Sequence, residues 1–159
     1  DGRWHLLFTR RTDELEHHRG QVSCPRGSCD GGETAVDTAL REVHEEIGIP
    51  SSDISVLGEI DEIWTPSRYV ISPVVGIVRS LGALAPNPAE VSRVFTAPLA
   101  FLADEGNAEI RTVHVNEFTR DVYYYHYDNE TIWGATAFIF RGLLRRIRTV
   151  LAESRARGE

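Results

Sequence analysis

The segment from Thr34 to Pro50 contains residues typical of both ends of an α-helix. Thr34 is a good N-cap, and Asp37, three positions later, completes a capping-box pattern, so a helix is predicted to begin here. Gly48 suits the left-handed residue that closes a helix, and Pro50 prevents its continuation. Apolar residues at helical spacing predict a buried stripe. They are Val36, Ala39, Leu40, Val43 and Ile47.

Stretches rich in β-branched and aromatic residues surround this helix and predict strands. They cover residues 4–10, 21–24, 54–65, 69–78 and 122–127. An amphipathic stretch, 90–102, follows a turn at Asn87-Pro88-Ala89, and apolar spacing over 134–151 predicts a second long helix. Strands without a regular alternation with helices indicate an α+β sandwich.

The length of the chain, 159 residues with 42% hydrophobic residues, predicts a single domain over residues 1–159. No apolar run approaches the ~20 residues that span a bilayer, so we expect a cytoplasmic protein without a membrane partner. The chain has no Met and opens in a strand-like segment, so its natural start is expected before Asp1. A missing strand there could contribute to a homodimer interface.

The net charge of −7, with no basic run, argues against binding along a nucleic-acid backbone. A small anionic substrate would need local Arg side chains or a metal ion. Cys24 and Cys29 lack the paired spacing of a zinc site or a disulfide framework, so free thiols in a reducing compartment are expected.

Three carboxylates, those of Glu42, Glu45 and Glu46, lie at positions i, i+3 and i+4 of the predicted helix. Each like-charged pair costs a few tenths of a kcal/mol, so a compensating charge is expected. Clustered oxygen ligands suit a hard divalent cation such as Mg²⁺ or Mn²⁺, which also accepts phosphate oxygens. Taken alone, the cluster could equally be a solvated helix face.

Residues around the cluster could support such a site. The guanidinium of Arg41 could fix the rotamer of Glu42, and Glu33 could pair with Arg41 or orient a water. The loop from Gly27 to Gly32 would let backbone carbonyls approach a metal. A metal-bridged phosphate is therefore the expected bound species.

Together these residues resemble the Nudix box. The pattern is Gly27, five residues, Glu33, seven residues, and then Arg41-Glu42-Val43-His44-Glu45-Glu46-Ile47-Gly48-Ile49. It spans 23 residues with nine specified positions, which makes a chance match improbable. The resemblance implies an α/β/α sandwich with a mixed sheet and a strand-loop-helix catalytic cassette. It also implies hydrolysis of nucleoside diphosphates linked to another group.

Carried over by position, the resemblance makes Glu42, Glu45 and Glu46 the metal ligands. Arg41 would orient them and Glu33 would support the site. Glu42 or Glu46 is the first candidate for the general base. Glu90 is a reserve candidate, and an ordinary acid at a helix start is its alternative interpretation.

The flanking residues resemble the coenzyme A pyrophosphatase subfamily, whose signature lies just upstream of the box. The matching residues are Leu6-Leu7-Phe8-Thr9-Arg10-Arg11-Thr12, Leu15, His18, Gly20-Gln21-Val22-Ser23 and Pro25, with further similarity at 65–66, 72–76, 87–91, 98–99 and 132–137. Such an enzyme would cleave coenzyme A or its thioesters into adenosine 3′,5′-bisphosphate and a 4′-phosphopantetheine.

Substrate contacts are expected from a few polar residues. Arg10, Arg11 and Arg68 are candidates for the 3′-phosphate, because guanidinium groups bind phosphate bidentately; ordinary surface positions are the alternative. His18 and Gln21 could line the cleft or belong to a polar turn.

The chain departs from the family at Cys24-Pro25-Arg26-Gly27, where Phe-Pro-Gly-Gly is usual. The family implies that the backbone carbonyl at position 26 is a metal ligand, which Arg26 can supply if its φ and ψ suit a non-glycine residue. The added cation could assist phosphate binding or compete with Mg²⁺.

Three functions therefore remain open. The first is a coenzyme A pyrophosphatase, and the second is a Nudix hydrolase for another nucleotide, such as ADP-ribose or an oxidised nucleoside triphosphate. The third is a Nudix-fold binding module without turnover.

Overall fold

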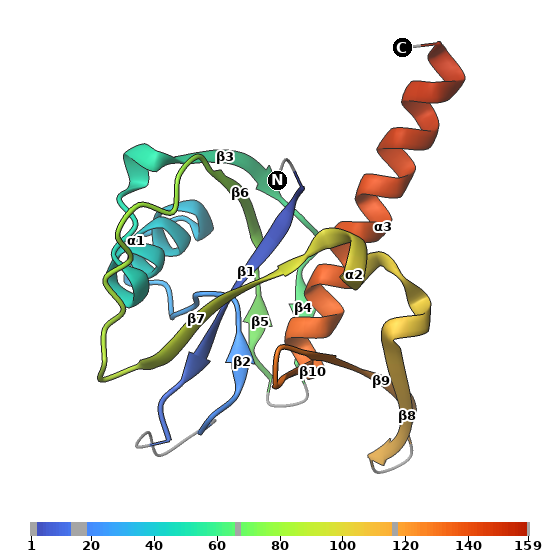
Figure 1. Ribbon diagram of the computed structural model, residues 1–159, viewed down its shortest axis with the longest axis horizontal. Coiled ribbons are helices and arrows are strands. Elements are labelled where there is room, and N and C mark those ends of the chain that lie inside the picture. Colours follow the sequence, from blue (N-terminus) through green and yellow to red (C-terminus); the bar gives the residue numbers. More distant parts are fainter. Residues whose placement is uncertain (1–2, 14–18, 66–67, 116–117, 159) are drawn as a thin grey trace.

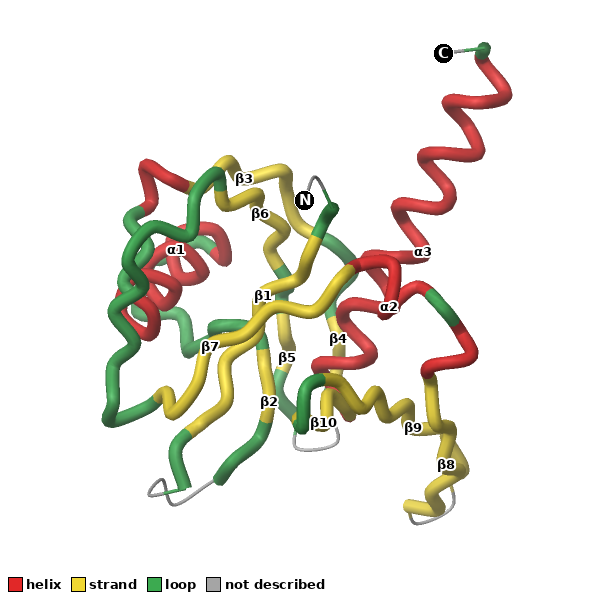
Figure 2. Tube along the Cα trace, viewed as in Figure 1, coloured by secondary structure: helices red, strands yellow, loops and turns green. Residues whose placement is uncertain are grey.

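The structure is a computed structural model that describes residues 3–13, 19–65, 68–115 and 118–158, without the side chains of residues 115 and 118 (Figures 1 and 2). The helices are α1 (Ala35–Ile47), α2 (Leu99–Ala103) and α3 (Gly134–Arg157), with 3₁₀ turns η1 (Ser51–Asp53) and η2 (Glu105–Asn107). The strands are β1 (His5–Arg11), β2 (Val22–Ser23), β3 (Ile54–Glu59), β4 (Ile63–Trp64), β5 (Val70–Ile71), β6 (Val74–Val78), β7 (Val91–Pro98), β8 (Ala108–Val115), β9 (Phe118–Tyr127) and β10 (Glu130–Trp133).

The ends of α1 are those that the sequence predicts. The Thr34 hydroxyl accepts the backbone N–H of Asp37 at 3.1 Å, and the Asp37 carboxylate accepts the backbone N–H of Thr34 at the same distance. Gly48 closes the helix with φ 76° and donates its N–H to the carbonyl of His44. The predicted capping box and C-terminal glycine are therefore confirmed.

The described strands form four small antiparallel sheets between the two long helices. Their orders are β2-β1-β7, β10-β9-β8, β3-β6 and β4-β5. In the first sheet, β1 pairs with β7 along almost its whole length, and Phe8 lies opposite Phe95. α1 lies on one side of the strands and α3 on the other (Figure 1), which confirms the α+β class.

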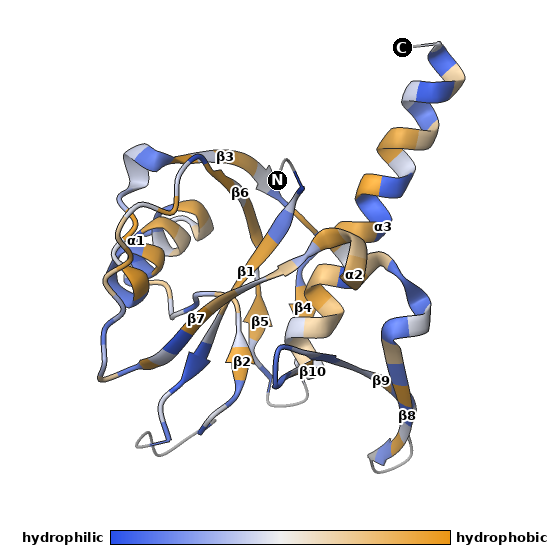
Figure 3. Cartoon of the chain, in the orientation of Figure 1, coloured by the Kyte–Doolittle hydropathy of each residue, from blue (hydrophilic) through white to orange (hydrophobic). Residues whose placement is uncertain are grey.

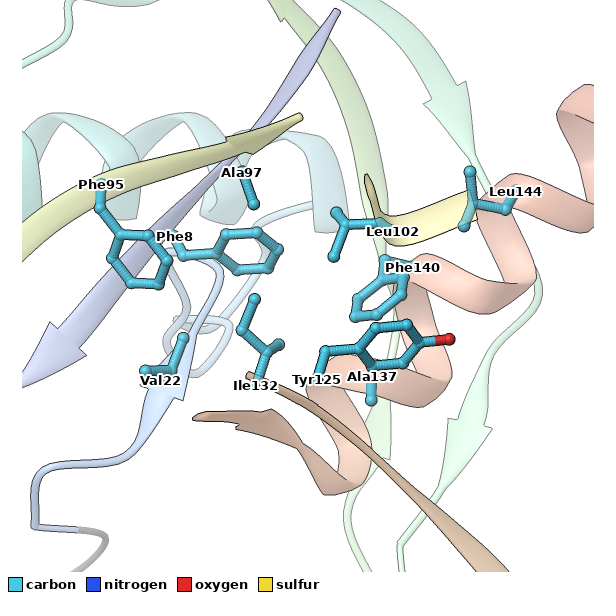
Figure 4. Close-up of a cluster of buried hydrophobic side chains, with 10 residues drawn as sticks. All are labelled: Phe8, Val22, Phe95, Ala97, Leu102, Tyr125, Ile132, Ala137, Phe140 and Leu144. Carbon is cyan, nitrogen blue, oxygen red and sulfur yellow. The ribbon is translucent and has the colours of Figure 1, made fainter. Parts of the chain in front are cut away.

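The main core joins the β1 sheet, the β9 sheet and α3 through aromatic side chains (Figure 4). Hydrophobic residues recur along α3 and along several strands (Figure 3). Phe8 stacks on Phe95 with ring centroids 5.5 Å apart and meets Phe140 edge-on at 6.4 Å. Tyr125 meets Phe140 at 4.9 Å. Phe140 therefore connects both sheets, and burying these large rings supplies much of the hydrophobic stabilisation.

Polar contacts fix α3 at its inner half. The Thr136 hydroxyl donates to the carbonyl of Val22, which ties the start of α3 to β2. Arg141 lies over the ring of Tyr123, donates to the Tyr125 hydroxyl at 2.5 Å and pairs with Glu105 at 2.9 Å. The outer half of α3 extends beyond the body of the molecule (Figure 2).

Several predicted elements differ from those observed. The amphipathic stretch 90–102 is a strand, β7, followed by the short helix α2, and α3 continues to Arg157 rather than ending at 151. The stretches 54–65 and 69–78 each contain two strands, and in the second the break falls at Ser72-Pro73, where proline has no N–H to donate. β8 and β10 were missed.

No helix within the described ranges is long and apolar enough to cross a bilayer.

Replacing Phe140 by Ala should lower the free energy of unfolding by about 3 to 5 kcal/mol, because it removes a ring that is 1% exposed and leaves a cavity between the sheets. Phe138→Ala is the matched control, since that ring is 56% exposed, and it should cost less than about 1 kcal/mol. Urea unfolding followed by circular dichroism measures both. Equal losses would contradict the central role of Phe140.

Candidate active site

The loop between β2 and α1 passes directly against the carboxylate side of the helix. A Cβ added at Gly27 would overlap the carboxylate of Glu42, so this position has room only for glycine unless the loop or the side chain moves. Glu42 is consequently only 8% exposed. The glycine of the predicted motif therefore serves a close approach of backbone to carboxylate.

The guanidinium of Arg41 brings four of the predicted residues together. It donates from Nε and Nη2 to the two oxygens of Glu33, at 2.9 and 3.0 Å, and from Nη1 to Glu42 at 2.7 Å and Glu45 at 3.1 Å. Nη2 also donates to the carbonyl of Ser28 at 3.0 Å. One cation thus offsets the repulsion between the carboxylates and links the loop to the helix.

Glu33 is held by more than its ion pair. Its carboxylate also accepts the backbone N–H of Asp30 at 3.0 Å and the hydroxyl of Thr38 at 2.9 Å. These bonds, that from Arg41 first, lower the pKa of Glu33 to about 2, so the carboxylate is ionised at all physiological pH values. Sequence reasoning missed Ser28, Asp30 and Thr38. Thr38 has a visible signal, since it lies one turn before Glu42 on the same helix face.

The carboxyl group of Glu46 has its pKa shifted in the direction opposite to that of Glu33. It is 2% exposed, its Oε1 accepts the backbone N–H of Arg26 at 3.5 Å, and its Oε2 is buried without a hydrogen-bond partner among the described residues. Burial, against the opposing Arg26 bond, raises the pKa of Glu46 to about 7, and the charges of Glu42 and Glu90 act in the same direction. The charge of Arg11 opposes this shift.

Glu90 reaches this neighbourhood through the segment that follows β6. The backbone N–H of Asn87 donates to the carbonyl of Glu46 at 2.9 Å, and that of Ala85 donates to the carbonyl of Ile47. The N–H of Thr12 then donates to the carbonyl of Glu90, just before β7. Glu90, the reserve candidate for the general base, is thus near Glu46. It directly precedes the strand β7 and is not an acid at a helix start.

The buried line of α1 differs from the predicted apolar stripe. Thr38, Glu42, Glu46 and Ile47 are buried, whereas Val36, Ala39, Leu40 and Val43 are half-buried. The loop covers the carboxylate side, and a pocket of about 410 Å³ between α1 and η1 leaves Leu40 partly open. Only Ile47 of the expected stripe is therefore buried, because tertiary contacts outweigh the helical pattern.

Arg10 and Arg11 have different surroundings, although they are neighbours. Arg10 pairs with Asp13 at 3.5 Å and with Glu130 at 3.8 Å. Arg11 is half-buried, its Nε is buried without a hydrogen-bond partner in the described part of the chain, and its charge acts on Glu46. A register shift in the pairing of β1 with β7 lies between the two residues, and of the two it is Arg11 whose charge acts on Glu46.

The other predicted substrate residues are less closely connected to the site. The backbone carbonyl of Gln21 accepts the N–H of Arg11 at 3.0 Å. Arg68 is exposed in the turn between β4 and β5, with φ 65°, and it forms no ion pair with the carboxylates of the described residues. His18 lies outside the described residues. The structure therefore brings Gln21 close through its backbone and leaves Arg68 apart.

Arg26 and Cys24 are the departures from the family pattern. Arg26 does not have a positive φ, so its backbone is accessible to a non-glycine residue, and its carbonyl as a metal ligand stays a prediction. Burial, with a smaller contribution from the charge of Glu46, raises the pKa of the Cys24 thiol to about 11. Cys29 is exposed, and both cysteines are free.

The donor set suits a hard divalent cation. Glu42, Glu45 and Glu46 offer only oxygens, and the unpaired Oε2 of Glu46 is the kind of buried acceptor that a cation would satisfy. Within the described ranges, no three His, Cys, Asp or Glu side chains converge as a preformed metal cage. Glu42 and Glu45 pair with Arg41 instead, so cation binding would require their rearrangement.

Glu46→Gln should stabilise the protein in EDTA at pH 8 by about 2 kcal/mol and have little effect at pH 4.5. The pKa of Glu46 is raised from 4.5 to about 7 in the folded state. The free energy of unfolding that is present below pH 4.5 is therefore lost as the pH rises through about 7, where the buried carboxyl must ionise. Gln keeps the neutral shape. Urea unfolding across this range measures the difference, with Glu45→Gln as the exposed control. A difference that does not grow with pH would contradict the assignment.

Solved structures share this fold at low sequence identity. A Caenorhabditis elegans Ap4A hydrolase is 16% identical with a TM-score of 0.53, and the match covers 62% of this chain and 72% of that one. RenU, a Nudix hydrolase of Mycobacterium smegmatis, is 20% identical with a TM-score of 0.52. The match covers 62% of this chain and 63% of RenU. These matches confirm the predicted Nudix fold.

Sequence comparison extends over more of the chain. NudL of Yersinia pestis, an uncharacterized Nudix hydrolase, is 36% identical over 143 residues, which are 89% of this chain and 72% of that protein. NudL of Yersinia pseudotuberculosis matches to the same extent. The family model of the NUDIX domain matches residues 1–119, which include the whole carboxylate cluster. The chain therefore belongs to the Nudix family of pyrophosphohydrolases.

Proposed function

We propose that this enzyme uses Mg²⁺ or Mn²⁺ to hydrolyse the pyrophosphate bond of coenzyme A or its thioesters. The observation that carries the hydrolytic assignment is the buried carboxylate of Glu46, whose unpaired Oε2 lies beside the Arg41 network. The choice of coenzyme A is supported by the resemblance of the stretch from Leu6 to Pro25 to the subfamily signature.

Glu42, Glu45 and Glu46 would hold the cation, together with the backbone carbonyl of Arg26. When bound, it neutralises charge on the phosphoryl oxygens and lowers the pKa of a water. Arg41 holds Glu42 and Glu45 on one side of α1 through bonds of 2.7 and 3.1 Å, which would rearrange as the cation binds. Arg41 and Glu33 thus act through the carboxylates as positioning residues.

The general base is assigned to Glu46, with Glu42 as the alternative and Glu90 in reserve. Oε2 of Glu46 has no hydrogen-bond partner among the described residues, so it is available to accept a proton. Water would add its oxygen to one phosphorus while the bond from that phosphorus to the bridging oxygen breaks. The products would be adenosine 3′,5′-bisphosphate and a 4′-phosphopantetheine.

A substrate panel distinguishes the three functions. Coenzyme A, dephospho-coenzyme A, ADP-ribose and nucleoside triphosphates are incubated with Mg²⁺ or Mn²⁺, and the products are identified by mass. We expect coenzyme A to have the highest kcat/KM. Preference for ADP-ribose would assign the enzyme to another Nudix substrate class, and tight binding without turnover would favour a binding module.

Glu46→Gln should lower kcat by at least about a hundredfold, because it removes a charged ligand and the proposed base while keeping the side-chain shape. Thermal unfolding should show that the variant remains folded. Glu109→Gln is the matched control, since that exposed carboxylate pairs with Arg111 and His126 on the β8–β9 hairpin. Near-normal turnover by Glu46→Gln would refute both of the roles proposed for Glu46.

A further inference from the structure

Two guanidinium groups near the carboxylates form no ion pair within the described part of the chain. Arg11 ends β1, and Arg26 lies in the loop one residue before Gly27. Neither guanidinium makes an ion pair within 4 Å among the described residues, and the buried Nε of Arg11 donates to nothing there. By contrast, Arg41, Arg93 and Arg141 each pair with a carboxylate.

The backbone of Arg26 connects the pair of Arg11 and Arg26 to the active site. Its backbone N–H donates to Oε1 of Glu46, so the loop carries Arg26 onto the carboxylate side of α1. Arg11 approaches the same place from β1, since its charge acts on both Glu46 and Arg26. The charges of both arginines thus act on Glu46 from different elements.

Their mutual repulsion is physically significant. The charge of Arg11 acts unfavourably on the Arg26 cation, whereas the charge of Glu46 acts favourably on it. The single carboxylate of Glu46 faces both cations, so a further anion would relieve the repulsion that remains between them. Phosphate is a suitable anion, because planar guanidinium groups donate bidentately to its oxygens.

We propose that Arg11 and Arg26 form a phosphate-binding subsite beside the carboxylate helix. The inference rests on the proposed function for its place in catalysis, where the subsite holds the phosphoryl group that does not receive the attacking water. The inference also decides whether the Arg26 cation assists phosphate binding or competes with Mg²⁺. Glu42 and Glu45 are paired with Arg41, and no described carboxylate forms an ion pair with the Arg26 guanidinium, which favours phosphate binding over competition with the metal.

The test is calorimetric titration with inorganic pyrophosphate, in EDTA and again with Mg²⁺. Arg11→Gln and Arg26→Gly should each weaken binding about tenfold or more under both conditions, as expected for the loss of a charge-assisted contact. Arg79→Gln is the matched control, because it removes an exposed cation that is bonded to the Ser55 hydroxyl. It should change the Kd by less than about twofold.

Unchanged binding in both Arg11→Gln and Arg26→Gly would overturn the proposal, as would an equal loss in Arg79→Gln, which would indicate a general charge effect. If thermal unfolding shows that Arg11→Gln is not folded, Arg11→Lys replaces it. Lys keeps the charge but loses the planar fork, so weaker binding is still expected. Binding through these arginines without any hydrolysis by the wild type would support the subsite while refuting the proposed function.

Discussion

The ion pairs of Arg41 hold together the part of the molecule on which its chemistry depends. Glu33, Glu42 and Glu45 converge on one guanidinium, and the carbonyl of Ser28 adds the loop to the same centre. Without that cation, neighbouring carboxylates on one helix would repel each other and the loop would lose its attachment. Gly27 completes the arrangement, because a side chain at this position would displace the Glu42 carboxylate or the loop.

The aromatic core supports this arrangement from the other side of the strands. Phe8 belongs to the same strand as Arg11, so the rings that fix β1 against β7 and α3 also fix where that guanidinium lies. The segment before β7 brings Glu90 towards Glu46 through backbone bonds to the end of α1. The positions of charged groups are thus set by hydrogen-bonded backbone and by rings distant from them.

Sequence reasoning identified α1 and the carboxylates well, because capping residues and motif spacing are local properties. It failed where neighbours distant in the chain decide the outcome. Glu42 and Glu46 are buried because a loop covers the polar side of the helix. Leu40 is only half-buried because it lines an open pocket. The separate surroundings of Arg10 and Arg11 depend on strand pairing and a register shift, and β8 and β10 carry weaker local patterns than the strands that were recognised.

The two sulfur atoms of the loop differ in a way that has a practical use. The Cys24 thiol packs against the core and holds its proton because of burial, whereas Cys29 is open to solvent five residues later. A thiol-directed fluorophore would therefore attach selectively at one natural position, within the segment that Arg41 ties to α1. The unaltered sequence thus provides a place for a spectroscopic label whose signal would follow the loop as ligands bind.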